Sequence, residues 1–237
     1  MTAATGDGRP RALVIGCGAL ATELVRIAAQ PGFEHLDVVC LAADLHNRPE
    51  RIASGVRRRI REARPRYGSV FVAYADCGTR GELDRVLAEE GVERLGGPHC
   101  YAAFAGGDAF AGLAAEEPGT FYLTDFLARH FDTLVVRSLG IDRHPELIPV
   151  YFGSYRRLVH LAQTDDPDLM ARARRAAAFL GVPFVHRPTG LGEVRTRIAA
   201  FAHAAAGAAA GSGLAVAAGA RATATTSPVA GAIAVPA

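Results

Sequence analysis

The chain has 237 residues, of which half are hydrophobic, and a formal net charge of +2. A chain of this length and apolar content can bury a full core within one domain, and its balanced charge gives no basic footprint for nucleic acid. All 26 basic residues are arginine. The absence of lysine excludes a Walker-A phosphate loop, a pyridoxal Schiff base and a lysine nucleophile.

The cysteine content and the hydropathy pattern indicate the cellular compartment in which the protein is expected. Four cysteines are spread along the chain, no basic start leads into an apolar leader, and no apolar run approaches about 18 residues. We therefore expect a cytoplasmic protein with reduced thiols and no contact with a membrane.

Strands and helices are predicted to alternate along the chain. Residues 1–10 are small, polar and aperiodic, which predicts a disordered tail and a domain that begins at Arg11. Strands are expected from Arg11 into a glycine turn, then at 69–74 and over Leu36–Ala43, Val92–Leu95, Arg157–Gln163 and Val182–His186. Helices are expected over Ala19–Gln30, Glu50–Ala63, Arg80–Glu90, Thr120–Leu139, Leu169–Leu180 and Thr189–Phe201, with two short ones within Tyr101–Glu117.

This alternation predicts an α/β fold. Strands that are joined by helices run parallel, so the expected architecture is a mostly parallel open sheet with helices on both faces, a Rossmann-like arrangement of three layers. The single domain should span residues 11–203. Residues 204–237 are rich in Ala, Gly, Ser and Thr, which predicts a low-complexity disordered tail, with a continuation of the last helix as the alternative for its first turns.

Three of the four cysteines come just after predicted strands. Cys17 lies in the first glycine turn, Cys77 follows the strand that begins at Ser69, and Cys100 ends a Pro-His-Cys sequence. The sequence Thr79-Arg-Gly-Glu82 has the form of a capping box that would start a helix just after Cys77. Cys40 lies within a predicted strand, where a packed core thiol is expected.

Residues that follow parallel strands gather at the carboxyl edge of the sheet, where such sheets bind ligands. Cys17, Cys77 and Cys100 are therefore candidate ligands of zinc or of an iron–sulfur cluster, with His99 or His46 as a further ligand. The alternative is that all three are core thiols that fit beside glycines.

Two other patterns are candidates for binding or catalysis. Gly16 and Gly18, in the sequence Gly16-Cys-Gly-Ala-Leu-Ala21, fit the G-x-G-x-x-A form of the dinucleotide-binding turn, which would make the protein a nucleotide-binding enzyme. Asp76 and Asp165 follow strands, so either could support the metal ligands or bind a small-molecule substrate, and Asp165 could also act as a base. For the Thr164–Pro167 segment the simpler interpretation is a helix cap followed by proline, and His160 within its strand is expected to be a satisfied core histidine.

Eight short motifs taken together resemble one family. They are Cys17-Gly-Ala-Leu, Leu45-His-Asn-Arg-Pro49, Asp76-Cys-Gly-Thr79, Gly97-Pro-His-Cys-Tyr101, Pro118-Gly-Thr-Phe-Tyr-Leu-Thr-Asp-Phe126, Asp142-Arg-His-Pro-Glu-Leu147, Tyr151-Phe-Gly and Ala162-Gln-Thr-Asp-Asp166. Over Ala12 to Ile198 the chain resembles the uncharacterised family known as domain of unknown function 1638.

The resemblance implies little about chemistry, because the family has no established activity. It implies a link to corrinoid-dependent methyltransferase systems of one-carbon metabolism, whose proteins would be the partners. The family's usual residue at the position of Gly16 is alanine, which weakens the dinucleotide interpretation. We therefore expect a metal-binding protein with a three-cysteine site, with a nucleotide-binding enzyme and a metal-free accessory protein as the alternatives.

Overall fold

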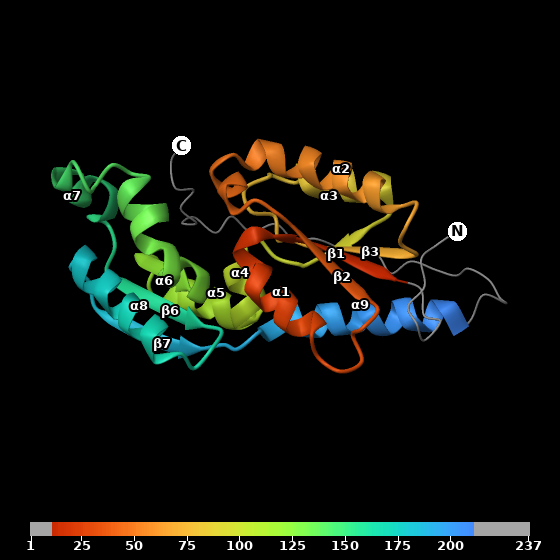
Figure 1. The fold of residues 1–237 in the computed structure, drawn as a ribbon. Helices are drawn as coiled ribbons and strands as arrows, with labels where there is room; N and C mark the ends of the chain where they lie inside the picture. The colour runs from red at the N-terminus through yellow and green to blue at the C-terminus, as the bar shows by residue number, and fades with distance from the viewer. Residues whose placement is uncertain (1–10, 211–237) are drawn as a thin grey trace.

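The strands form two separate parallel sheets in the computed structural model, which describes residues 11–210 (Figure 1). The first sheet has the order β2-β1-β3-β4, with β1 at Ala12–Cys17, β2 at Leu36–Leu41, β3 at Ser69–Ala73 and β4 at Glu93–Arg94. The second has the order β5-β6-β7, with β5 at Thr120–Thr124, β6 at Arg157–Ala162 and β7 at Phe184–Pro188. The α/β class, the parallel strands and the layered Rossmann-like arrangement are confirmed, but two sheets stand where one was expected.

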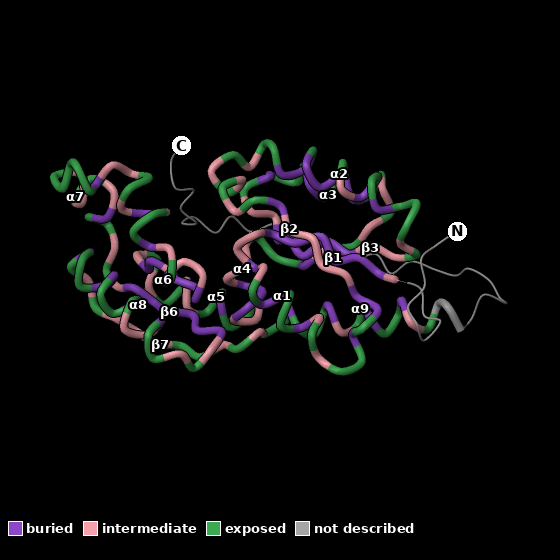
Figure 2. The backbone as a smooth tube through the Cα atoms, in the orientation of Figure 1, coloured by how far each residue is buried: buried purple, intermediate pink, exposed green. Residues whose placement is uncertain are grey.

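The first sheet lies between two layers of helices, which together form the first lobe. One face carries α1 (Ala21–Ala28) and α9 (Gly192–Ala210), and the other carries α2 (Ile52–Ala63) and α3 (Glu82–Glu90) (Figure 1). Helix α2 buries Ile52, Val56 and Ile60 at a spacing of four residues and turns its arginines outward, as expected for an amphipathic surface helix. Strand β1 is buried along its whole length because helices cover both of its faces (Figure 2).

The second sheet is also covered on both faces and forms the second lobe. Helices α4 (Cys100–Ala105) and α5 (Gly107–Glu116) pack on one face, where Phe110 meets Val159 and Leu161. Helices α6 (Asp125–Phe131) and α8 (Pro167–Leu180) cover the other face around Leu158. The segment between α6 and β6 contains a π-helix at Asp132–Arg137, a 3-10 turn at Pro145–Leu147 and α7 at Ile148–Phe152.

Two elements hold the lobes together. Helix α4 contributes Ala103 and Phe104 to the core of the first lobe and Ala102 to the second. The chain leaves β7 and returns to the first lobe as α9, where the Ala202 carbonyl accepts a hydrogen bond of 3.0 Å from Nε2 of His35. The 3-10 turn η1 (Gly18–Leu20), which follows β1, contacts α6, so the carboxyl edges of the two sheets face each other (Figure 1).

Three local predictions need correction. Residues 120–124 form β5 rather than the start of a helix, because they pair in register with β6 and bury Phe121 and Leu123. Helix α3 begins at Glu82, with Gly81 as its cap, so Thr79 does not cap it. Helix α9 runs on to Ala210, past the predicted domain end at residue 203, because Ala205 still packs in the core; the alternative of a continued last helix is the correct one for these turns.

Some predictions concern segments at the two ends. The predicted disordered tails, residues 1–10 and the part of 204–237 beyond Ala210, lie outside the described residues. Over residues 11–210, no helix combines the length and the apolar character that crossing a membrane requires.

Candidate functional site

The order of the first sheet defines where a ligand is expected. The chain leaves β1 to form β2 on one side and then crosses back to form β3 on the other side of β1. Open parallel sheets bind ligands outside the carboxyl ends of the strands at such a switch point. Cys17 is the last residue of β1, and Cys77 lies in the loop after β3. These two thiols therefore flank the switch point.

Cys17 is almost completely buried, at 2% exposure. Its Sγ accepts a hydrogen bond of 3.3 Å from the backbone N–H of Ala19 and lies 3.5 Å from Nδ1 of His46. Burial raises the pKa of the Cys17 thiol to about 11, because a thiolate would lose its hydration there. The Cys17 side chain is therefore a neutral thiol at physiological pH.

His46 connects Cys17 to Cys77. It lies in the exposed turn η2 (Ala43–Asn47), and its Nδ1 is 3.3 Å from the carbonyl of Ala43 as well as near Cys17. Partial desolvation lowers the pKa of His46, but its contact with Cys77 and the Ala43 carbonyl raise the pKa by more. The imidazole thus lies at the mouth of the switch point between two thiols.

The loop that carries Cys77 has a strained backbone and is held in place by hydrogen bonds. Cys77 has a φ of +50°, a left-handed conformation that costs a non-glycine residue about 1–3 kcal/mol. The carboxylate of Asp76 holds this turn by accepting from the Thr79 hydroxyl at 2.7 Å and from the N–H groups of Gly81 at 3.0 Å and Arg80 at 3.2 Å. Asp76, a candidate catalytic acid, is therefore placed as the residue that fixes the orientation of Cys77.

Cys100 and Tyr74 complete the group. Cys100 is the first residue of α4, and burial raises the pKa of its thiol, with Cys77 and Cys17 raising it further. The Tyr74 hydroxyl is buried, and it interacts with the thiol of Cys17. Burial raises the pKa of Tyr74, and the thiols of Cys17 and Cys77 add to this effect. We call Cys17, His46, Tyr74, Cys77 and Cys100 the switch-point cluster.

The other candidate histidine, His99, directly precedes Cys100 and packs among aromatic rings. The His99 ring packs against Tyr101 and Phe110, with ring centroids at 5.1 Å and 4.7 Å. Burial lowers the pKa of His99. Of the two histidines that the sequence offered as ligands, the structure brings His46 to the thiols and packs His99 among aromatic rings.

Packing accounts for both glycines of the first turn. A Cβ atom on Gly18 would lie 2.8 Å from the backbone nitrogen of Ala43 and 2.8 Å from the carbonyl oxygen of Leu41. A Cβ atom on Gly16 would overlap the side chain of Leu24. These glycines allow β1, β2 and α1 to approach closely, with no nucleotide needed to explain them.

The other residues that the sequence analysis discussed have structural roles or lie at the surface. Cys40 pairs in register with Gly16 and packs against the core of the first lobe, as expected. Asp166 caps α8 by accepting from the N–H groups of Asp168 at 2.9 Å and Leu169 at 3.3 Å, which confirms the predicted cap. Asp165 is exposed beside this cap.

A model of the family "Protein of unknown function (DUF1638)" matches residues 40–198, more than half of the chain. The chain belongs to the DUF1638 family. No curated protein and no solved structure matches it. The DUF1638 match begins at Cys40 rather than at Ala12, so it includes His46, Tyr74, Cys77 and Cys100, while Cys17 and β1 lie before it.

The DUF1638 region also contains a buried polar network that the sequence did not indicate. Asp125 is 1% exposed, and its Oδ1 lies 2.9 Å from Nε2 of His160. Its Oδ2 accepts from the Thr164 hydroxyl at 2.6 Å, and its backbone N–H donates to Oε1 of Gln163 at 2.8 Å. Recognising β5 would have placed Asp125 directly after a strand, where it would have been a candidate.

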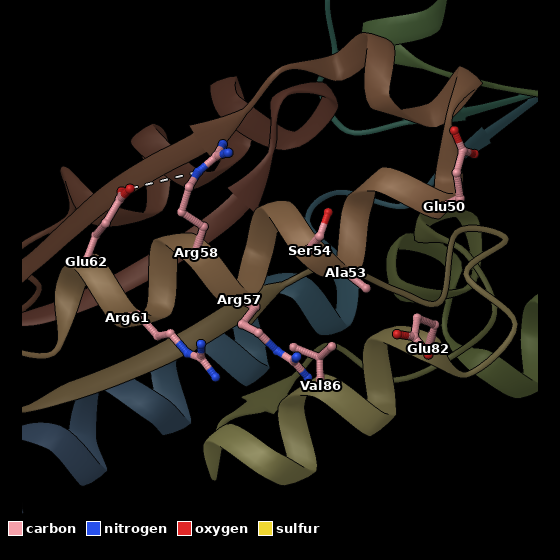
Figure 3. A pocket seen from close by; sticks show the side chains of 9 residues that line it. All are labelled: Glu50, Ala53, Ser54, Arg57, Arg58, Arg61, Glu62, Glu82 and Val86. Atoms are coloured by element: carbon pink, nitrogen blue, oxygen red, sulfur yellow. Dashed lines mark ion pairs between the residues drawn. The ribbon is translucent and has the colours of Figure 1, made fainter.

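An open groove on the DUF1638 chain, of about 580 Å³, lies between α2 and α3 (Figure 3). Arg57, Arg58 and Arg61 line it, and each of them pairs with a carboxylate of Glu62, Glu89 or Glu90. Because these guanidinium groups already have partners, the groove is a solvated charged surface.

Proposed function

We propose that the protein binds a soft metal centre at the switch point through Cys17, Cys77 and Cys100, with His46 as a fourth donor. The observation that carries this proposal is the convergence of three thiols and an imidazole on the carboxyl ends of β1 and β3, the edge where parallel sheets place their ligands.

The chemical types of these donor groups suit thiophilic metals. Thiolate and imidazole groups are the usual ligands of zinc and of iron–sulfur clusters. Burial disfavours the thiolate forms of Cys17 and Cys100, and a bound metal would favour them. The Tyr74 hydroxyl, which already interacts with Cys17, could donate a hydrogen bond to a thiolate of such a centre.

A cluster and a single ion differ in the spacing that they require of their ligands. Among residues 11–210, no three His, Cys, Asp or Glu side chains are arranged to hold one metal ion. The thiolates of an iron–sulfur cluster bind different iron atoms and can therefore lie farther apart than the ligands of one zinc ion. We accordingly place an iron–sulfur cluster before zinc.

The test is anaerobic purification followed by analysis of iron, zinc and acid-labile sulfide and by an absorption spectrum. Wild-type protein should carry metal in a fixed ratio, and Cys17→Ala, Cys77→Ala and Cys100→Ala should each lose most of it. Cys40→Ala is the matched control and should keep its metal, because this thiol packs in the core. A triple variant of the first three cysteines that retains full metal content would overturn the proposal.

The biological setting follows from the family resemblance and from the thiols. We propose a reducing cytoplasmic setting, in keeping with four cysteines that form no disulfide. We further propose a role beside corrinoid-dependent methyl transfer. Mixing the metal-loaded protein with a corrinoid methyltransferase system should then change the corrinoid spectrum, and no change in the presence of a reductant would remove this role.

A further inference from the structure

Strand β2 is an open edge of the first sheet. It pairs with β1 on one side, and no strand of the described residues pairs with it on the other. Two of its six residues are buried, whereas all six residues of β1 are buried (Figure 2). The outer side of β2 therefore offers a row of backbone groups to another strand.

The ladder with β1 shows which backbone groups of β2 point outward. The N–H group of Ala12 donates to the carbonyl of His35 at 2.9 Å. Because backbone groups alternate in direction along a strand, those of Val39 face β1 and those of Val38 and Cys40 face away from it. Within residues 11–210, the backbone groups of Val38 and Cys40 form no hydrogen bond outside the ladder.

The other sheet edges are protected, and β2 is not. Strand β4 has two residues, both charged, and β5 is buried at four of its five residues. Strand β7 contains Arg187 and ends at Pro188, which has no N–H group to donate. Strand β2 has six residues without proline, and it pairs with β1 without a bulge. It thus lacks the devices by which proteins prevent a sheet edge from pairing.

The one charge on β2 is already compensated within the chain. Oδ2 of Asp37 accepts a hydrogen bond of 2.7 Å from Nε of Arg11, and a second nitrogen of Arg11 binds Oδ1. The other side chains of β2 are Leu, Val and Cys. A strand that adds to this edge therefore needs no opposite charge of its own.

We infer that β2 pairs in antiparallel orientation with β2 of a second copy of this chain, so that two four-stranded sheets join into one. A second copy fits because β2 is the open edge of each copy. Pairing β2 with its equivalent uses both open edges and closes the assembly at a two-fold symmetric dimer. The inference goes beyond the proposed function and does not depend on it, because no proposed metal ligand lies in β2.

The register of the new pair follows from symmetry and charge. Residues directly opposite each other in an antiparallel pair have the same backbone direction, so the two-fold axis passes through one residue. An axis at Asp37 would place two carboxylates opposite each other, which is destabilising. An axis at Val38 or Val39 avoids this and uses the outward backbone groups of Val38 and Cys40.

Helix α1 is compatible with this pairing. It packs on β2, and its Val25 is 58% exposed. A two-fold axis perpendicular to the sheet keeps the α1 helices of both copies on the same face, one on each side of the seam. Val25 is then an apolar residue available for contact between these helices.

The first experiment measures the mass of the full chain by light scattering after size-exclusion chromatography. Wild-type protein should have the mass of two 24.8 kDa chains. Val38→Pro removes an outward N–H group that both registers use and leaves the ladder with β1 intact, so it should raise the dissociation constant of the dimer at least about tenfold. Val38→Ala keeps this N–H group and is the matched control, which should remain a dimer.

The second experiment traps the pair and does not depend on how Val38→Pro folds. In a Cys40→Ala background, Val38→Cys or Val39→Cys places two thiols opposite each other, at a Cα separation of about 4.5–5.5 Å that a disulfide can span. Treatment with diamide should then give a covalent dimer that a reductant reverses, and the position that reacts identifies the axis. Val150→Cys, at a position that is 73% exposed on α7, should give no more covalent dimer than the background.

Hydrogen exchange distinguishes a second copy from other occupants of the edge. The amide groups of Val38 and Cys40 should exchange slowly in the dimer and faster when the protein is diluted. A monomeric mass with slow exchange at every concentration would show that another segment of the same chain covers β2, and this overturns the inference. A monomeric mass with fast exchange also overturns it, as does a wild-type dimer in which neither Val38→Cys nor Val39→Cys crosslinks.

Discussion

The network around Asp125 allows the sharpest test of how the second lobe is stabilised. Asp125→Ala removes the carboxylate that pairs with Nε2 of His160 at 2.9 Å and accepts from the Thr164 hydroxyl at 2.6 Å. Both nitrogens of the His160 ring would then be buried without a partner among the described residues, since Nδ1 already lacks one. The bond from the Asp125 backbone N–H to Gln163 would remain.

The expected loss follows from these bonds. A hydrogen bond to a charged group contributes about 1.5–3 kcal/mol, so losing two of them should lower the free energy of unfolding by about 3–6 kcal/mol. Domains of this size are stable by about 5–15 kcal/mol, so the variant would be marginally folded.

Urea denaturation followed by circular dichroism measures the effect. Asp166→Ala is the matched control, because it removes the same chemical group from the cap of α8, where the expected cost is about 1 kcal/mol. The urea concentration at the unfolding midpoint should fall far more for Asp125→Ala than for Asp166→Ala. The slope of the free energy of unfolding against urea concentration should be similar in the two variants. Equal shifts in the two variants would refute the reasoning that the Asp125 network stabilises this lobe.

Four other outcomes are expected. Gly18→Ala should destabilise the protein by about 1–3 kcal/mol, because the added methyl group would meet the backbone of Leu41 and Ala43. Gly112→Ala is the control in an open helical position and should stabilise the protein by up to about 1 kcal/mol. Thermal melts measure both effects. Cys77→Gly should be more stable than Cys77→Ala by about 1 kcal/mol, because glycine accepts the left-handed conformation, and both should lose metal. Cys40→Ala should cost about 1 kcal/mol and keep its metal, so metal loss in this variant would contradict the assignment of ligands. Because the folded pKa of Asp125 is lowered, its contribution is present above about pH 4 and is lost as the pH falls below that value, so Asp125→Asn should weaken the acid dependence of stability.

The sequence predicted elements whose pattern is local. The strand that begins at Arg11 and the strand from Ser69 were found because uninterrupted apolar runs lead into glycine turns. Strand β5 was missed because the aromatic residues after Pro118-Gly119 fit a buried helix as well as a strand. Pairing with β6, which lies about forty residues away in the chain, decides between the two.

The candidate site was predicted in part for the same reason. Cys17 and Cys77 follow recognisable strands, so parallel order alone places both at one edge. Thr79 looked like a helix cap because its spacing to Glu82 fits, but its hydroxyl donates to Asp76 instead. Asp125 gave no signal, because the strand that ends just before it was not recognised.

The return of α9 to the first lobe has a consequence for biosynthesis. The sheet built from residues 12–94 cannot complete its core until Val194 and Ile198 have left the ribosome, because both belong to that core. Domains formed from consecutive residues can fold while the chain is still growing, but here the N-terminal half must wait for nearly all of the second lobe. During synthesis the apolar face that α9 finally covers is therefore open to chaperones, and a nascent chain stopped before residue 192 would expose it permanently.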